Sequence, residues 1–159
     1  MKIKFLITAI AVLFALTFCM ASCSKDDETT STQNNDNGNI NPSTTKMKIT
    51  IGTAVFTATL YDNPSANVFK ASLPLSINMT ELNGNEKYYD LPNPLPTNAS
   101  AGGDLKVGDL MLYGNNVLVL FYKNLNTTYN YTKLGYLDNP NGLASALGAG
   151  NITVKFEIN

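Results

Sequence analysis

The chain has 159 residues but no histidine and no tryptophan, and all 11 of its basic residues are lysines, so arginine is absent as well. Without histidine there is no serine–histidine–aspartate triad, no cysteine–histidine pair and no imidazole ligand for a metal. Without arginine there is no planar guanidinium to bind a phosphate or carboxylate through two hydrogen bonds. The formal net charge of −1 argues against nucleic acid as a partner. We therefore predict no catalytic residue, no bound metal and no cofactor.

The length and the polar composition favour a single domain that is rich in strands and loops. A chain of this length accommodates one domain, and an apolar content of 44 % is enough for a hydrophobic core. Charged residues make up only 14 % of the chain, so asparagine supplies much of the polar surface. Because asparagine favours turns over helix interiors, the composition predicts a mainly β fold.

The first 22 residues have the layout of a secretory signal. Lys2 and Lys4 give a positive start, and residues 5–18 are apolar except for Thr8 and Thr17. This run is shorter than the roughly 20 apolar residues that a membrane-spanning helix needs. We therefore predict a signal peptide over residues 1–22.

A cysteine follows the apolar run directly. The sequence Met20-Ala21-Ser22-Cys23 resembles the bacterial lipobox, although Met20 stands where leucine is usual. We predict Cys23 as the lipid attachment site, with the membrane as a partner through the lipid anchor. An ordinary signal peptide cut near Ser22 and an uncleaved anchor are the alternatives. The other cysteine, Cys19, lies inside the signal, so no disulfide is expected.

A polar segment separates Cys23 from the first predicted strand. Its start, residues 24–28 with the sequence SKDDE, resembles the acidic export signal of surface lipoproteins in the Bacteroidetes. The resemblance implies display on the cell surface. The periplasmic side of the outer membrane is the alternative, as is an acidic stretch that only solvates a tether. Residues 23–46 contain Ile40 as their only aliphatic residue, so we predict a disordered tether and a domain over residues 47–159.

Short alternating or apolar runs fill the domain and predict seven or eight strands. They lie at residues 48–51, 55–60, 75–82, 86–91, 110–113, 117–122, 131–137 and 151–158. Residues 98–108 are predicted as a loop. Many short strands with two short helices favour a small closed β-barrel or a sandwich.

Two segments carry helix-start signals, in which an N-cap candidate precedes a proline. Asn63 before Pro64 predicts a helix that ends at Pro74. A second helix is predicted from residues 138–140, which read Asp-Asn-Pro, with Gly148 as its stop. Residues 138–142 also place several oxygen ligands close together, as in a calcium loop, but a helix N-cap explains them better.

Five segments of the domain, taken together and in this order, resemble the bacterial cyclophilin-like domain. They are FTATLYDNP at 56–64, LNGNEKYY at 82–89, GDLMLY at 108–113, LFYK at 120–123 and LGYLD at 134–138. The resemblance covers almost all of residues 47–158 and implies a small closed cyclophilin-like β-barrel with two short helices. Domains of this family stand alone, follow lipoprotein signals or accompany flavodoxin-type domains, and they have no established general activity.

The name of the fold suggests a prolyl isomerase, but the residue types do not support that activity. Cyclophilins rely on an active-site arginine, helped by histidine or tryptophan and by phenylalanine, methionine and glutamine. This chain lacks the first three residue types, and its single glutamine is Gln33 in the predicted tether. A lysine supplies charge but not the planar fork of arginine. A shared fold does not carry a shared function.

Polar and aromatic residues gather in segment 81–90, and further tyrosines recur on neighbouring predicted strands. Strand alternation places Glu86 and Tyr88 on one face and Lys87 and Tyr89 on the other. Tyrosines at 113, 122, 129, 131 and 136 suit stacking on sugars or flat ligands, and they equally suit core or rim packing. The candidate pocket consists of Asn83, Glu86, Tyr88, Tyr113, Phe121, Tyr122 and Tyr131.

These observations predict a surface-exposed outer-membrane lipoprotein with a non-catalytic module that binds a small ligand or a protein partner. The alternative is an enzyme or enzyme accessory, either linked to redox chemistry through a flavodoxin-type partner or, less favoured, a peptidyl-prolyl isomerase. The sequence does not name the ligand.

Overall fold

The computed structural model describes residues 41–159, with side chains described from residue 45 onward. The predicted signal peptide, Cys23 and the predicted tether up to residue 40 lie outside this part of the chain. Residues 41–159 form nine strands and two helices: β1 (Asn41–Ile51), β2 (Ala54–Asp62), α1 (Pro64–Ala71), β3 (Leu75–Leu82), β4 (Glu86–Asp90), β5 (Ser100–Leu105), β6 (Asp109–Tyr113), β7 (Val117–Phe121), β8 (Leu125–Leu137), α2 (Leu143–Leu147) and β9 (Ile152–Ile158). Within the described residues no helix has the length and apolar character to cross a membrane.

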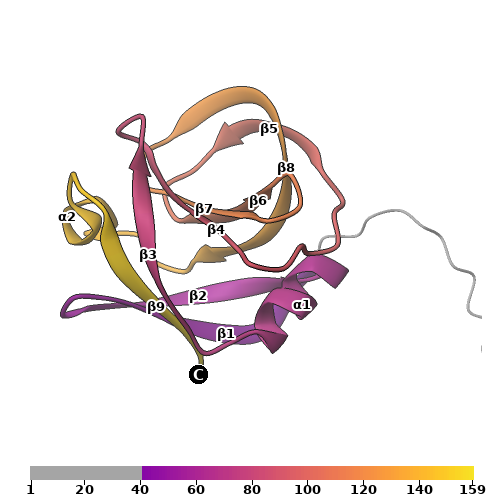
Figure 1. Ribbon diagram of the computed structural model, residues 1–159, viewed down its shortest axis with the longest axis horizontal. Helices are drawn as coiled ribbons and strands as arrows, with labels where there is room; N and C mark the ends of the chain where they lie inside the picture. Colours follow the sequence, from indigo (N-terminus) through magenta and orange to yellow (C-terminus); the bar gives the residue numbers. More distant parts are fainter. Residues whose placement is uncertain (1–40) are drawn as a thin grey trace, which may run out of the picture. The chain divides into compact units, whose positions relative to one another are not determined.

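The strands form one antiparallel sheet that closes on itself into a ring, which confirms the predicted mainly β fold with two short helices. The strand order is β2-β1-β9-β3-β4-β7-β6-β8-β5, and a further pairing of β2 with β8 completes the ring (Figure 1). Strand β5 lies outside the ring and, among the described strands, pairs with β8 alone. Figure 1 shows β5 and the first part of β8 arching over β6 and β7.

The hairpin of β6 and β7 is apolar on both faces because it separates two hydrophobic clusters. Leu110, Leu112 and Leu118 belong to the main core, together with residues of both helices. Met111 and Val119 face the opposite way and join a smaller cluster with Leu105, Phe121 and Tyr131. The apolar runs at 110–113 and 117–122 predict two strands, and the structure confirms both and pairs them as an antiparallel hairpin.

Helix α1 begins as the sequence predicts. Asn63 is its N-cap, with the side-chain oxygen accepting a hydrogen bond of 2.8 Å from the backbone N–H of Ala66, and Pro64 is the first helical residue. The helix ends at Ala71, before the predicted stop at Pro74. Its buried Phe69 meets Phe156 of β9 edge-on, with ring centroids 6.0 Å apart.

The predicted start of the second helix is wrong. Helix α2 begins at Leu143, and its N-cap is Gly142 with a φ of 84°. The Asp138 carboxylate accepts hydrogen bonds from Thr59 and from Lys46, so it links the end of β8 to β2 and β1 instead of capping a helix. The alternative of a calcium loop gains no support, since residues 41–159 hold no group of three or more acidic, cysteine or histidine side chains that could bind a metal.

The predicted loop over residues 98–108 is also wrong, because it contains β5, and β8 begins at Leu125 instead of residue 131. Strand β5 pairs with the first half of β8, and the residues of these two segments, 100–105 and 125–130, are mostly polar or glycine. Half-exposed strands without apolar alternation give no strand signal in the sequence. At the other end, β1 begins at Asn41, ahead of the predicted strand at 48–51.

Candidate functional site

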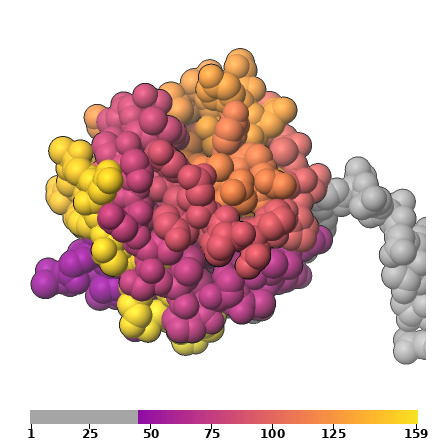
Figure 2. Space-filling model, viewed as in Figure 1, coloured from indigo at the N-terminus to yellow at the C-terminus, as the bar shows by residue number. Residues whose placement is uncertain are grey.

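A pocket of about 380 Å³ lies on the outer face of the sheet, on the side away from the main core. We call it the tyrosine–carboxylate pocket. Its volume is within the range of about 300–1,000 Å³ that is usual for small-ligand sites. Segments around residues 80–90 and 125–131 lie next to each other near the top of the face that Figure 2 shows. The pocket is lined by Leu82, Asn83, Glu86, Tyr88, Asp90, Tyr113, Val117, Val119, Tyr129 and Tyr131.

Strand β4 and the register of its neighbours place the lining side chains. Every second residue of β4 faces the pocket, namely Glu86, Tyr88 and Asp90. Their partners on β7 are Phe121, Val119 and Val117, respectively. On β6, Tyr113 lies opposite Val117, and on β8, Tyr131 lies opposite Tyr113. Four adjacent strands therefore supply the floor and one wall of the pocket.

The wall on the β8 side consists of tyrosine rings set at steep angles to one another. The ring centroids of Tyr113 and Tyr129 are 6.1 Å apart with an interplanar angle of 83°, and those of Tyr113 and Tyr131 are 5.5 Å apart at 51°. Tyr129 is 64 % exposed and Tyr113 is 44 % exposed. Tyr131 is buried and contacts Phe121 edge-on, with centroids 5.7 Å apart. Two exposed rings therefore stand on a buried aromatic base.

Glu86 is the buried polar group of this pocket. Only 8 % of the residue is exposed, and its Oε2 atom has no hydrogen-bond partner among the described residues. Burial, and next the negative charge of Glu81, raise the pKa of the Glu86 carboxyl above its ordinary value. Burial and the nearby Glu86 also raise the pKa of Tyr131, to about 12, so its hydroxyl stays protonated. The pocket thus holds a desolvated carboxyl group with one unused acceptor oxygen.

The structure brings together five of the seven residues predicted for the pocket: Asn83, Glu86, Tyr88, Tyr113 and Tyr131. Phe121 is fully buried in the cluster beneath them and does not line the pocket. Tyr122 belongs to a different hollow, which it shares with Glu81 and Gly148. Tyr122 follows the last residue of β7, and its hydroxyl donates hydrogen bonds to Glu81 on the other side of the sheet.

Five lining residues are missing from the predicted set: Leu82, Asp90, Val117, Val119 and Tyr129. The sequence could have predicted Asp90, because strand alternation places it on the same face as Glu86 and Tyr88. The two valines follow from the register of β4 and β7, which the sequence does not state. Tyr129 was grouped with Tyr113 among the tyrosines that suit stacking, but it precedes the predicted strand at 131–137 and was left out of the predicted pocket.

A second polar cluster lies on the opposite face of β4, where Lys87 is fully buried. Its ammonium group donates hydrogen bonds to Glu81 Oε2, to the carbonyl of Gly148 at 2.9 Å and to the carbonyl of Gly150 at 2.7 Å. An ammonium group has three hydrogens, so all of them have partners. Lys87 therefore links β4 to β3 and to the segment between α2 and β9.

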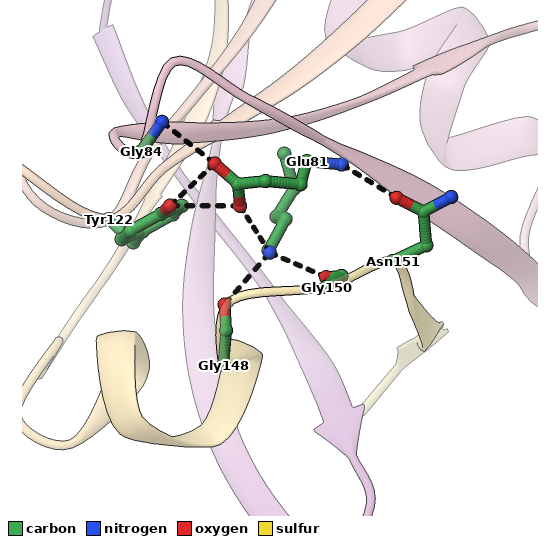
Figure 3. A network of polar contacts seen from close by, with 7 residues as sticks. Glu81, Gly84, Tyr122, Gly148, Gly150 and Asn151 are labelled. Atoms are coloured by element: carbon green, nitrogen blue, oxygen red, sulfur yellow. Dashed lines mark hydrogen bonds and ion pairs between the residues drawn. The ribbon is translucent and has the colours of Figure 1, made fainter.

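Glu81 completes this Lys87 cluster. Its carboxylate also accepts hydrogen bonds from the Tyr122 hydroxyl at 2.8 Å and from the backbone N–H of Gly84 at 2.8 Å (Figure 3). Burial alone would raise the pKa of Glu81, but the hydrogen bonds from Lys87, Tyr122 and Gly84 together lower it. The cluster is saturated with its own contacts, so we assign it a structural role and not a binding role.

Replacement of Lys87 by methionine tests that structural role. Lys87→Met removes the charged donor of the Glu81 carboxylate and the side-chain donor of two carbonyls, and we expect the free energy of unfolding to fall by about 3 kcal/mol in urea titrations. Lys155→Met is the matched control, because Lys155 pairs with Glu157 on the surface and its side chain is 49 % exposed. Equal stabilities of the two variants would contradict the assignment.

Replacement of Glu86 by glutamine tests the electrostatics of the tyrosine–carboxylate pocket. Because burial raises the folded-state pKa of Glu86 above its ordinary value of 4.5, the folded state binds more protons between the two pKa values. The wild-type protein therefore loses stability as pH rises through this window, and Glu86→Gln does not. We expect the stability of the variant to rise relative to that of the wild type as the pH increases above 4.5, as measured by thermal or urea unfolding.

The ionisable groups that interact electrostatically with Glu86, namely Glu81, Tyr122 and Tyr131, are present in both proteins, so the difference between the two curves isolates Glu86. Parallel stability curves over this pH range would show that the carboxyl group is not held in a desolvating site.

Residues 49–157 match the cyclophilin-like family, and the match runs from β1 to β9. No curated protein matches the chain. Because the match spans most of the 159 residues, the chain belongs to the cyclophilin-like family.

Proposed function

We propose that this protein is a lipid-anchored outer-membrane protein, exposed at the cell surface, whose cyclophilin-like domain binds a ligand in the tyrosine–carboxylate pocket without catalysing a reaction. The observation that carries the binding role is Glu86, a buried carboxyl group whose Oε2 has no partner among residues 41–159. The anchoring role rests on the sequence around Cys23.

An unused buried acceptor supports a binding role because it is unfavourable in the free protein. A buried polar atom without a hydrogen bond costs about 1–3 kcal/mol. A donor on a ligand would remove that cost. Tyr113 and Tyr129 also expose large ring surfaces at the same place, which a ligand would cover.

The placement of the carboxylates supports binding without catalysis. Glu86 and Asp90 are four residues apart on β4, so their Cα atoms are separated by roughly 13 Å. Carboxylate pairs that act on one glycosidic bond are about 5–9.5 Å apart. Glu81 lies opposite Lys87 on the neighbouring strand β3, and its carboxylate is bound to the ammonium group of Lys87.

The anchor is tested by replacing the predicted lipidated cysteine. Cys23→Ala removes the thiol that would carry the lipid, so we expect the protein to move from the membrane fraction to the soluble fraction. Immunoblots of the two fractions measure this shift, and Cys19→Ala is the matched control that stays in the membrane fraction. Protease treatment of intact cells separates surface display from a periplasmic position. A Cys23→Ala variant that remains in the membrane would contradict the proposal.

Binding in the pocket is tested by thermal shift with the full chain against peptides, glycans, flavins and organic cations. A true ligand at a hundred times its Kd stabilises the folded state by about 2.7 kcal/mol, which raises the melting temperature by several degrees. Tyr129→Ala should abolish the shift, because the residue lines the pocket yet is 64 % exposed, so its loss leaves the fold intact.

Tyr136→Ala is the control for this experiment. It removes a tyrosine from the same strand, where the ring contacts Tyr61 at 5.5 Å and does not line the pocket. The proposal fails if no compound class raises the melting temperature, or if Tyr129→Ala keeps the full shift.

A further inference from the structure

We propose that the ligand of the tyrosine–carboxylate pocket is an organic cation, an alkylammonium group that lies between the tyrosine rings and the Glu86 carboxylate. This inference rests on the proposed function of the pocket as a ligand site and goes further by naming the chemical class. Four features of the pocket support it: its charge, the unused oxygen of Glu86, the arrangement of its rings and its apolar floor.

The charge of the lining favours a positive ligand. Glu86 and Asp90 contribute carboxylates, and none of the described residues that line the pocket is a lysine. The neighbouring Lys87 does not neutralise Glu86, because it faces the other side of β4 and its three hydrogens are bound by Glu81, Gly148 and Gly150. An anionic ligand would meet repulsion here, and a cation would meet attraction.

Glu86 favours a charged donor over a neutral one. Its Oε2 atom is buried without a partner, in surroundings that penalise the ionised form of the carboxyl group. A cation at this position supplies the missing contact and offsets the penalty of ionisation at the same time. A neutral hydroxyl donor supplies only the first of these two effects.

The rings form a corner and not a flat platform. Tyr113 and Tyr129 stand at 83° to each other, and Tyr131 adds a third ring at 51° to Tyr113. The faces of aromatic rings carry negative charge density, and several rings at steep angles around one point form the cage that binds ammonium groups. A sugar face or a flavin would instead require one broad ring surface.

The floor of the pocket suits an alkyl chain. Val117 and Val119 lie on β7, between the carboxylates of β4 and the ring of Tyr113 on β6, and Leu82 adds a third aliphatic side chain to the lining. The pocket volume of about 380 Å³ accommodates a small ammonium compound or the end of a lysine side chain. Both sources present the same chemistry, so the experiment includes both.

Two matched pairs of probes test the inference by NMR titration of the full chain. Choline is compared with its neutral carbon analogue 3,3-dimethylbutan-1-ol, and Nα-acetyl-lysine methylamide is compared with its Nε-acetylated form. The ring resonances of Tyr113 and Tyr129 report binding at the pocket. We expect the charged member of at least one pair to bind at least about tenfold more tightly than its neutral partner.

Glu86→Gln should reduce that preference to less than about threefold, because it removes the buried charge and keeps the shape. Asp62→Asn is the matched control, since Asp62 is a carboxylate outside the pocket, and it should leave the preference unchanged.

The outcomes separate the inference from the proposed function. Preference for the charged member in either pair supports the inference. A preference in the choline pair identifies a quaternary ammonium compound as the ligand, and a preference in the lysine pair identifies a lysine side chain. If neutral members shift the tyrosine resonances as strongly as charged ones, the inference is overturned while the pocket remains a ligand site. If the probes and the wider compound panel all leave these resonances unchanged, both are overturned.

Discussion

The pairing of β8 with β2 is the constraint on which the rest of the structure depends, because it turns an open sheet into a ring. Gly135 makes this pairing possible. A Cβ atom at Gly135 would lie 2.5 Å from the carbonyl oxygen of Thr59 and 3.2 Å from the Cα atom of Leu60. Once the second half of β8 is held against β2 and β6, its first half extends past the ring with β5 and carries Tyr129 to the pocket, while Tyr131 lies where the two halves meet. The single long strand β8 therefore both closes the ring and supplies tyrosines to the pocket.

Strand β4 shows how two neighbouring ionisable residues take opposite roles. Lys87 faces inward, and every hydrogen of its ammonium group has an acceptor. Glu86 faces outward, is almost as deeply buried, and keeps one oxygen without a partner. A buried charge that is fully bonded stabilises one arrangement of the chain, whereas an incompletely bonded one is unfavourable until something else binds it. This difference is why we assign a structural role to one face and a binding role to the other.

Sequence reasoning succeeded where apolar periodicity and local capping decide the structure. The helix start at Asn63, the hairpin of β6 and β7 and the facing of Glu86 and Tyr88 all follow from such local rules. It failed at β5 and at the first half of β8, whose residues are polar or glycine and whose pairing is with each other. It also failed at Asp138, which resembles an N-cap but contacts Lys46, 92 residues away in sequence. Long-range partners of this kind leave no periodic signal, and for the same reason Tyr129 was not placed in the pocket.

Membership of the cyclophilin-like family accounts for the fold but does not supply the chemistry of the pocket. The central claim is that Glu86 is a desolvated carboxyl group in the free protein and binds a cationic ligand. The pKa of Glu86, measured with and without such a ligand, tests this claim most directly. The side-chain carboxyl carbon of Glu86, labelled with carbon-13 and assigned with Glu86→Gln, is followed by NMR over pH, first in the free protein and then with saturating choline or Nα-acetyl-lysine methylamide. We predict a pKa above 4.5 in the free protein that falls when at least one of these two cations is bound. An ordinary pKa in the free protein, or one that both cations leave unchanged, would contradict the claim.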